Sequence, residues 1–331
     1  MKAICVTPQR KLEARDVPEP TKAAPGHVLI DMQACAINHG DKTFLQTPSA
    51  AGDARWTGKY DVWGASGVGR VIDIGAGVPA ELLGKHVALY RSLCRTPESI
   101  GLWSELAHMP YRTCLILPEH VSARDYCGSL VNAMTAYAFL EEIIEAGHKA
   151  VIVTAGTSAT GRALVTLARI RDISTIILVR TEQAADSLRG SGAAHVIVTK
   201  HGFADTLGAL AIQLKATAVF EGVGGELLTT ISPELPMNTT VYFYGFLGGT
   251  IPISIPPALF MKKNLTLKRF SNFDSQTVRD NDRLISALNA LADVIHEQAF
   301  RTKIGREFQL DQIEQAISYV SQEGRKAVLV L

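Results

Sequence analysis

The central third of the chain alternates apolar β-like runs with segments of helical spacing. The first run, "AVIVTA" at residues 150–155, leads through small residues into "TGRALVTLARI" at 160–170, whose apolar residues lie on one helical face. Further runs follow at residues 175–180, 195–199, 216–222 and 240–248, separated by helical segments at 182–192, 203–214 and 225–235. Apolar strands that alternate with amphipathic helices predict a parallel sheet covered on both faces, the core of a doubly wound α/β domain.

The residues on either side of this region have a different pattern. Short β-like runs broken by turn residues precede it, as in "HVLIDMQACAI" at 27–37 and "KHVALY" at 85–90. A long helical segment at 280–300 and a final apolar run at 326–331 follow it. We therefore predict that the doubly wound domain is inserted into a β-rich domain, with residues 1–122 and 265–331 forming the β-rich domain and 123–264 the doubly wound one.

Length and composition limit the classes of protein to consider. The 331 residues exceed the usual single-domain length, and a net charge of +1 without a basic tract argues against nucleic acid as a partner. No run approaches the roughly 18 apolar residues of a membrane span, and the first residues lack the apolar core of a signal peptide. The five cysteines are widely spaced and odd in number, which favours a reducing, cytoplasmic setting over a disulfide framework.

The turn after the first central run has the spacing of a phosphate-binding loop. In "AGTSATG", Ala155, Ser158 and Gly161 recur at intervals of three, with serine where a glycine is usual. Small residues let the backbone approach a diphosphate, and the amides at the start of the following helix hold its charge. A buried βα turn without a ligand would carry similar residues, so the loop alone is weak evidence.

The ends of the other central strands strengthen the prediction of a dinucleotide site. The second run ends at Arg180, where a guanidinium suits the 2′-phosphate of NADP better than the 2′-hydroxyl of NAD, although a plain surface arginine is the alternative. Glycines end the fourth and fifth runs, at Gly222 and Gly245 among others. Open α/β sheets bind ligands at the carboxyl ends of their strands, so these positions predict a cofactor crevice unless the glycines serve only core packing.

Taken together, the segments resemble the medium-chain dehydrogenase/reductase superfamily over nearly the whole chain. The stretches that carry the resemblance include "GHVLIDMQACAINHGD", "GASGVGRVIDIGAGV", "VNAMTAY", "RTEQAADSLRGSGAAHVI" and "GRKAVLVL". The chain is most similar to the zinc-free quinone oxidoreductase branch, with 2-enoyl-thioester reductases as close relatives. The resemblance implies a GroES-like catalytic domain, built from both chain ends, and a Rossmann domain that binds NADP as NADPH.

The resemblance also assigns candidate site residues. Asn38 and Asp41 match an N-x-x-D pattern that lines the active site, and Thr135 matches a threonine near the nicotinamide. Arg180 and Thr181 match the site of the adenosine 2′-phosphate. The implied cofactor-binding set is Thr135, Ala155, Gly156, Thr157, Ser158, Ala159, Thr160, Gly161, Arg180, Thr181, Gly222, Val223, Gly245, Phe246 and Leu247.

The resemblance does not extend to the zinc ligands. The zinc-dependent branch has a cysteine where this chain has Asn38 and a His-Glu pair where it has Ala65 and Ser66, and no cysteines cluster here. We therefore expect no metal, and hydride transfer to an acceptor that is already electrophilic, such as a quinone or an enone.

The proton donor for such a reaction is harder to assign. The tyrosine that often follows the N-x-x-D segment is missing, because Thr43 and Phe44 stand there. Tyr60, at the end of a predicted long loop from Gln46 to Asp61, is the candidate donor, with loop packing as its alternative role. His39 titrates in a suitable range but is better interpreted as a hydrogen-bonded structural histidine.

Three functions are compatible with the sequence. The first is an NADPH-dependent reductase of quinones or enones, the second a 2-enoyl-thioester reductase, and the third a non-catalytic NADPH-binding redox sensor. The third would suit the serine in the loop and the missing tyrosine. We also expect a homodimer, with the segment Thr250–Ile255 as a candidate sheet edge, although its prolines would equally keep an edge unpaired.

Overall fold

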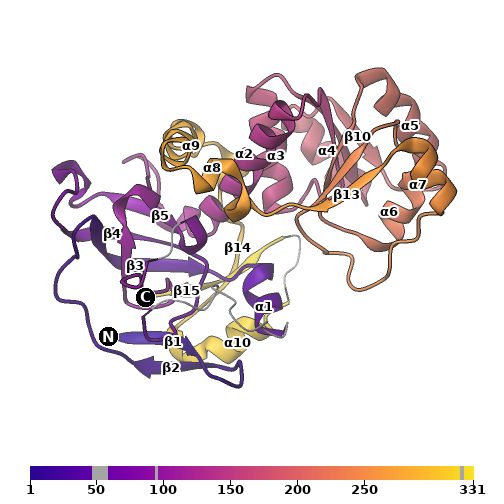
Figure 1. Ribbon diagram of the computed structural model, residues 1–331. Coiled ribbons are helices and arrows are strands. Elements are labelled where there is room, and N and C mark those ends of the chain that lie inside the picture. The colour runs from indigo at the N-terminus through magenta and orange to yellow at the C-terminus, as the bar shows by residue number, and fades with distance from the viewer. Residues whose placement is uncertain (47–58, 94–95, 321–323) are drawn as a thin grey trace. The chain divides into compact units, whose positions relative to one another are not determined.

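The computed structural model describes residues 1–46, 59–93, 96–320 and 324–331, which form two compact units (Figure 1). Unit 1 contains residues 1–134 and 278–331, and unit 2 contains residues 135–277. The domain boundaries expected from the sequence lie somewhat before these divisions. One reason is helix α2, Ser129–Glu145, which begins in unit 1 and continues into unit 2.

Unit 1 is built on a mostly antiparallel sheet that contains both ends of the chain. Its strand order is β14-β15-β3-β4-β5-β7, with β6 also paired to β3, and β1 and β2 form a separate pair. The strands are β1 Lys2–Val6, β2 Leu12–Asp16, β3 His27–Ala36, β4 Ser66–Ile74, β5 His86–Tyr90, β6 Leu106–Pro110, β7 Cys114–Ile116, β14 Ile304–Phe308 and β15 Lys326–Val330. The helices are α1 His39–Gln46, α8 Gln276–Arg279 at the division, α9 Asn281–Val294 and α10 Ile313–Ser318.

The core of unit 1 forms where β3 and its neighbours bury their apolar side chains. Trp103 is fully buried there, and Gly64 makes room for it. A Cβ atom at Gly64 would lie 2.2 Å from Cδ1 of Trp103, and the backbone there has a φ of +101°. Only glycine meets both requirements, so this position is set by packing.

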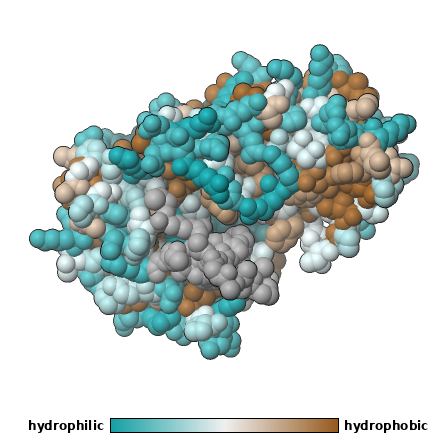
Figure 2. Space-filling view, in the orientation of Figure 1, coloured by the Kyte–Doolittle hydropathy of each residue, from teal (hydrophilic) through white to brown (hydrophobic). Residues whose placement is uncertain are grey.

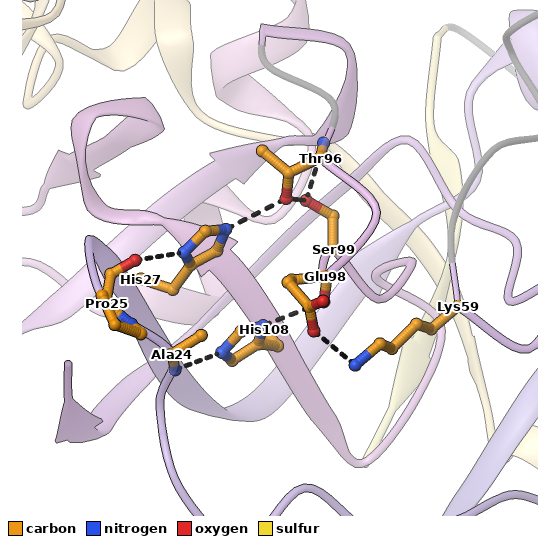
Figure 3. A network of polar contacts seen from close by, with 8 residues as sticks. All are labelled: Ala24, Pro25, His27, Lys59, Thr96, Glu98, Ser99 and His108. Carbon is orange, nitrogen blue, oxygen red and sulfur yellow. Dashed lines mark hydrogen bonds and ion pairs between the residues drawn. The ribbon is translucent and has the colours of Figure 1, made fainter.

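A polar network connects β3, β6 and the loop before β6 (Figure 3). The rings of His27 and His108 stack with centroids 4.9 Å apart and planes 3° apart. The amide of Ala24 donates to Nε2 of His108 (2.9 Å), whose Nδ1 lies 2.9 Å from the Glu98 carbonyl oxygen. Because a carbonyl only accepts, His108 carries its proton on Nδ1 and is neutral in this arrangement. Glu98 in turn pairs with Lys59.

Unit 2 is a parallel six-stranded sheet with the order β10-β9-β8-β11-β12-β13. Its strands are β8 Ala150–Val153, β9 Ser174–Val179, β10 His195–Val198, β11 Ala218–Glu221, β12 Thr240–Phe243 and β13 Thr266–Arg269. Its helices are the second part of α2, α3 Ala159–Ile170, α4 Glu182–Gly190, α5 Phe203–Leu214, α6 Gly225–Ile231 and α7 Pro257–Lys263 (Figure 1). The doubly wound parallel sheet is therefore confirmed, and its strand order reverses between β8 and β11.

The edge of this sheet differs from the expectation. The segment Thr250–Ile255 has no regular secondary structure, and the edge is β13, which pairs with β12. The backbone amide of Ser254 is instead bonded to the Thr229 hydroxyl (2.9 Å). Prolines at 252 and 256 remove two amides that a ladder would need, which explains why this segment does not extend the sheet.

Candidate functional site

The loop between β8 and α3 is shaped by close packing of the helix against the sheet. A Cβ atom at Gly156 would lie 2.1 Å from Cγ2 of Ile177, and one at Gly161 would lie 2.1 Å from the Ala155 carbonyl oxygen. Ser158 needs no such space, because it is the N-cap of α3 and its Oγ accepts the Gly161 N–H (3.0 Å). The serine in this loop therefore stabilises the helix start in a way that glycine cannot.

Hydrogen bonds bring together the ends of the three strands on which the sequence placed cofactor residues. The Gly222 amide donates to Oγ1 of Thr154 (3.0 Å), which joins the end of β11 to the end of β8. The Leu247 amide donates to the Gly222 carbonyl (2.8 Å), and the Gly248 amide donates to that of Val223 (2.9 Å). The loops after β8, β11 and β12 thus meet at the carboxyl edge, where the strand order reverses.

Arg180 directly follows β9, the neighbour of β8. Its side chain is exposed, and it forms no hydrogen bond or ion pair within the part of the chain that the structure describes. Thr181 has a structural role, because its hydroxyl accepts the Ala184 N–H (3.2 Å) and caps α4. A guanidinium that no carboxylate neutralises, next to a phosphate-type loop, is suited to bind a phosphate group.

A second cation, which the sequence analysis missed, lies at the start of the helix that follows the loop. Arg162 is in the first turn of α3, and its guanidinium donates to the Thr157 carbonyl (2.9 Å). Burial lowers the pKa of Arg162, and no carboxylate of the described residues offsets this cost. The signal was present in the sequence as a basic residue directly after the last loop glycine. The positive charge of the loop is therefore larger than its backbone alone would supply.

Two further side chains, the buried Glu221 and the partly buried Tyr244, were also missed. Glu221 accepts three hydrogen bonds at Oε1, from Thr154 Oγ1 (2.9 Å) and from the amides of Val223 (2.5 Å) and Gly224 (2.7 Å). Its complete burial raises the pKa of this carboxyl. Tyr244 stacks on Phe220 with ring centroids 3.8 Å apart, and its hydroxyl lies 3.5 Å from Ser158 Oγ.

The remaining predicted residues of unit 2 lie on α2 and after β12. Thr135 is on α2, where its Oγ1 accepts a hydrogen bond from Nδ2 of Asn272 (2.7 Å). Phe246 and Leu247 expose about half of their side chains, 49% and 50%. At Gly245 a Cβ atom would meet only ordinary contacts, the nearest 3.4 Å away, so this glycine is not required by packing within unit 2.

In unit 1, Asn38 and Asp41 form one hydrogen-bonded cluster between β3 and β4. Asp41 is buried, and its oxygens accept from the Asn38 amide (2.8 Å), from Asn38 Nδ2 (3.1 Å) and from the Ala65 amide (3.1 Å). Asn38 also donates to Ser66 Oγ (2.8 Å), and Lys326 donates to its Oδ1. Burial raises the pKa of Asp41, while the hydrogen bonds from Asn38 act against this shift. Asp41 therefore orients Asn38 and the start of β4.

The two candidates for proton transfer are placed differently. Tyr60 is 39% exposed and has a left-handed backbone with a φ of +64°. Most of the loop that the sequence places before it, residues 47–58, lies outside the described part of the chain. His39, at the start of α1, has a pKa lowered by burial and then by the nearby charge of Lys42. Neither geometry decides between a catalytic and a structural role.

Comparison with known proteins agrees with this architecture. Residues 24–119 match the alcohol dehydrogenase GroES-like domain family. The mitochondrial enoyl-[acyl-carrier-protein] reductase of Dictyostelium discoideum is 26% identical over 323 residues, which cover 92% of this chain and 86% of that protein. A solved structure from Bacillus thuringiensis, named as an NADPH:quinone reductase, has a TM-score of 0.79 at 21% identity and covers 100% of this chain and 98% of its own.

A mycobacterial protein in complex with NADPH has a TM-score of 0.74 at 21% identity, with complete coverage of both chains. These similarities agree with the resemblance to the medium-chain dehydrogenase/reductase superfamily seen in the sequence. The combination of a GroES-like domain with a Rossmann domain is confirmed.

The site in unit 2 fits a dinucleotide. The Ala159 amide, at the start of α3, has no hydrogen-bond partner among the described residues, so it is free to donate to a phosphate. Arg162 and Arg180 supply positive charge on the loop and on the next strand end. Within the described ranges no cluster of His, Cys, Asp or Glu side chains is arranged to hold a metal ion, and no helix is long and apolar enough to cross a membrane.

Proposed function

We propose that this protein is an NADPH-dependent reductase that transfers a hydride to a quinone or an enone. The observation that carries the proposal is the combination of a capped phosphate loop after β8 with Arg180 after β9, whose side chain has no partner among the described residues. The loop suits a diphosphate, and the arginine suits a 2′-phosphate, which only NADP carries. Support comes from the structural neighbours named as NADPH:quinone reductases and from the one complexed with NADPH.

We assign the residues of unit 2 the following roles in cofactor binding. Ser158, Ala159 and Arg162 bind the diphosphate, and Arg180 binds the 2′-phosphate. The remaining positions expected from the sequence, from Thr135 to Leu247, line the rest of the cofactor site. NADPH supplies the hydride when it is bound, and the protein orients the nicotinamide.

The acceptor site is the less defined part of the proposal. Asn38, oriented by Asp41 and Lys326, offers a polar surface in unit 1 to a quinone or enone carbonyl. Tyr60 is the proposed proton donor for an enone, since its partial exposure leaves the phenol accessible. The cytoplasmic, metal-free enzyme expected from the sequence is part of the same proposal.

A second candidate function is reduction of 2-enoyl thioesters. It is favoured by the Dictyostelium relative, whose name is that of an enoyl reductase and whose similarity extends over most of both chains. The two functions share the hydride step and differ in the acceptor. A thioester substrate also brings a long acyl-pantetheine arm, which needs additional contacts.

We also propose that the protein is a homodimer formed through unit 2. Strand β13 is an edge strand with all four residues exposed, and Leu267 on it is apolar. Phe260 and Met261 on the preceding α7 are 39% and 78% exposed. Figure 2 shows hydrophobic residues gathered on this side of unit 2. Pairing two such edges would bury apolar surface and satisfy free backbone groups.

The decisive experiment measures NADPH binding and turnover with the same purified protein. Binding of NADPH and NADH is titrated by fluorescence, and NADPH oxidation is then followed with quinones, enones and enoyl thioesters. We expect NADPH to bind more tightly than NADH and to be oxidised by quinones or enones. Turnover with enoyl thioesters alone would favour the second function. Binding without turnover would favour a redox sensor, and no binding would contradict all three.

A further inference from the structure

The hydroxyl oxygen of Ser158 has two neighbours, the Gly161 amide and the Tyr244 hydroxyl. The Gly161 amide can only donate, so Ser158 Oγ is the acceptor of that 3.0 Å contact. The hydroxyl of Tyr244, the residue directly after β12, lies 3.5 Å from the same oxygen. A serine oxygen accepts two hydrogen bonds and donates one. If Tyr244 is the donor, the only hydrogen-bonding group left on Ser158 is its proton.

The surroundings of Tyr244 fix its ring and keep its hydroxyl protonated, so that it can act as a donor. Its ring is fixed by stacking on Phe220 at an interplanar angle of 11°, and its amide donates to the Glu221 carbonyl (3.0 Å). Gly222 leaves space for the phenol, since a Cβ atom there would lie 2.5 Å from the hydroxyl oxygen. Burial raises the pKa of Tyr244, the hydrogen bond with Ser158 acts against this shift and the nearby Glu221 adds to it, so the phenol keeps its proton. Within the described chain, Ser158 Oγ is the hydrogen-bond partner of this hydroxyl, and either oxygen can be the donor.

We propose that Tyr244 is a positioning residue that turns the Ser158 hydroxyl into a hydrogen-bond donor for the diphosphate of the bound dinucleotide. The inference rests on the proposed function, because it specifies how that cofactor site holds its ligand. Once the Gly161 amide and the Tyr244 phenol occupy the oxygen, the serine proton has no acceptor in the loop and is available to a phosphate oxygen. The serine at this position is then a ligand contact in its own right.

The distance between the Tyr244 and Ser158 hydroxyl oxygens indicates that their hydrogen bond matters more with a ligand bound than without one. At 3.5 Å it is longer than an optimal hydroxyl pair, so it contributes little to the stability of the ligand-free protein. A phosphate oxygen that accepts the serine proton polarises Ser158 and strengthens the bond from Tyr244. The effect of removing the phenol hydroxyl should therefore appear in ligand binding and not in folding.

The chain offers a matched control two residues earlier. Tyr242 is a buried tyrosine of β12, and its hydroxyl lies 3.3 Å from Nε2 of His148, away from the loop. The variants Tyr244→Phe and Tyr242→Phe each remove one phenol oxygen and keep the ring. Only the first removes a group that contacts the phosphate loop.

The experiment measures dissociation constants of NADPH, NADH and adenosine 2′-phosphate for wild type and variants. We expect Tyr244→Phe and Ser158→Ala each to weaken NADPH and NADH about five- to tenfold, the scale of one hydrogen bond to a charged group. The double variant should be no weaker than Ser158→Ala alone, because the phenol acts through the serine. Tyr242→Phe should bind like wild type, and Ser158→Thr, which keeps the hydroxyl, should bind nearly as well. Adenosine 2′-phosphate lacks the diphosphate, so none of these changes should affect it.

Each other outcome overturns the inference. Wild-type affinity in Tyr244→Phe would show that the phenol only packs, and fully additive losses in the double variant would show that the two residues act independently. Equal losses for adenosine 2′-phosphate would indicate a general disturbance of unit 2. If Tyr244→Phe does not fold, the Ser158→Ala and Ser158→Thr pair decides whether the hydroxyl is a ligand contact. Wild-type protein that binds no dinucleotide would overturn the proposed function, whereas normal binding with unaffected variants would overturn only this inference.

Discussion

Replacement of Arg180 by alanine is the sharpest test of the choice between NADP and NAD. Because the side chain is exposed and has no bonded partner within the described residues, the substitution removes no contact that stabilises the fold. The whole effect should therefore be on ligand binding. A hydrogen bond between a guanidinium and a phosphate contributes about 1.5–3 kcal/mol, and solvent screening at an exposed site reduces this to about 1–2 kcal/mol. The expected loss in NADPH affinity is about five- to thirtyfold.

The assay compares dissociation constants for NADPH and NADH at two salt concentrations. NADH lacks the 2′-phosphate, so its affinity should change by less than about twofold, and the loss for NADPH should shrink as salt screens the interaction. Arg180→Lys should be intermediate, because an ammonium keeps the charge but lacks the planar donor fork. Arg189→Ala is the matched control, since this exposed arginine of unit 2 is already paired with Asp186 (3.0 Å). Equal losses for both cofactors, or a loss in the control, would refute the assignment.

Three further predictions concern stability. Asp41→Asn should destabilise unit 1 by about 1–3 kcal/mol in urea unfolding, because an amide cannot accept all three N–H groups that the carboxylate accepts; an unchanged midpoint would contradict this. Gly222→Ala should cost about 1–3 kcal/mol and also weaken NADPH binding, since the added Cβ would collide with Tyr244; thermal unfolding and titration of the same sample would show both effects or contradict the packing argument. Burial lowers the pKa of His108 below its ordinary 6.5, so the folded protein favours the neutral ring. Its contribution should be complete above about pH 6.5 and decline as the pH falls through the lower folded value; unfolding from pH 8 to 5 should show a shallower decline in His108→Gln.

Much of the fold could be predicted because its strands are buried. Strands β8 and β11 have only buried residues, and such runs of apolar residues between helices are a strong signal for a parallel sheet. Strand β13 was missed because it is an edge strand with four exposed residues, two of them charged, "TLKR". Nothing in its composition distinguishes it from a loop. Its pairing depends on β12 being available beside it, which is a property of the whole sheet.

The phosphate-type loop of the site could be predicted from the sequence, but the side chains that contact this loop from other strands could not. The spacing of Ala155, Ser158 and Gly161 is local and can be seen in the sequence. The contact between Ser158 and Tyr244 spans 86 positions and depends on the strand order, in which β11 lies between β8 and β12. A single sequence contains no sign that the residue after β12 can reach across β11. Arg162, in contrast, was visible beside the loop and should have been considered.

The structure also changes which residues carry the functional argument. Glycines at the strand ends were interpreted as room for a cofactor, yet Gly156 and Gly161 are required by helix–sheet packing and Gly222 by the ring of Tyr244. A fold without any ligand would need the same three glycines. What packing does not explain is charge: Arg162 is desolvated, and neither it nor Arg180, the residue after β9, is paired with a carboxylate among the described residues. Burying a positive charge without a counterion in the protein costs free energy of folding, and a bound anion would offset that cost. The two arginines, and not the glycines, are therefore the residues whose substitution distinguishes a cofactor site from a buried turn.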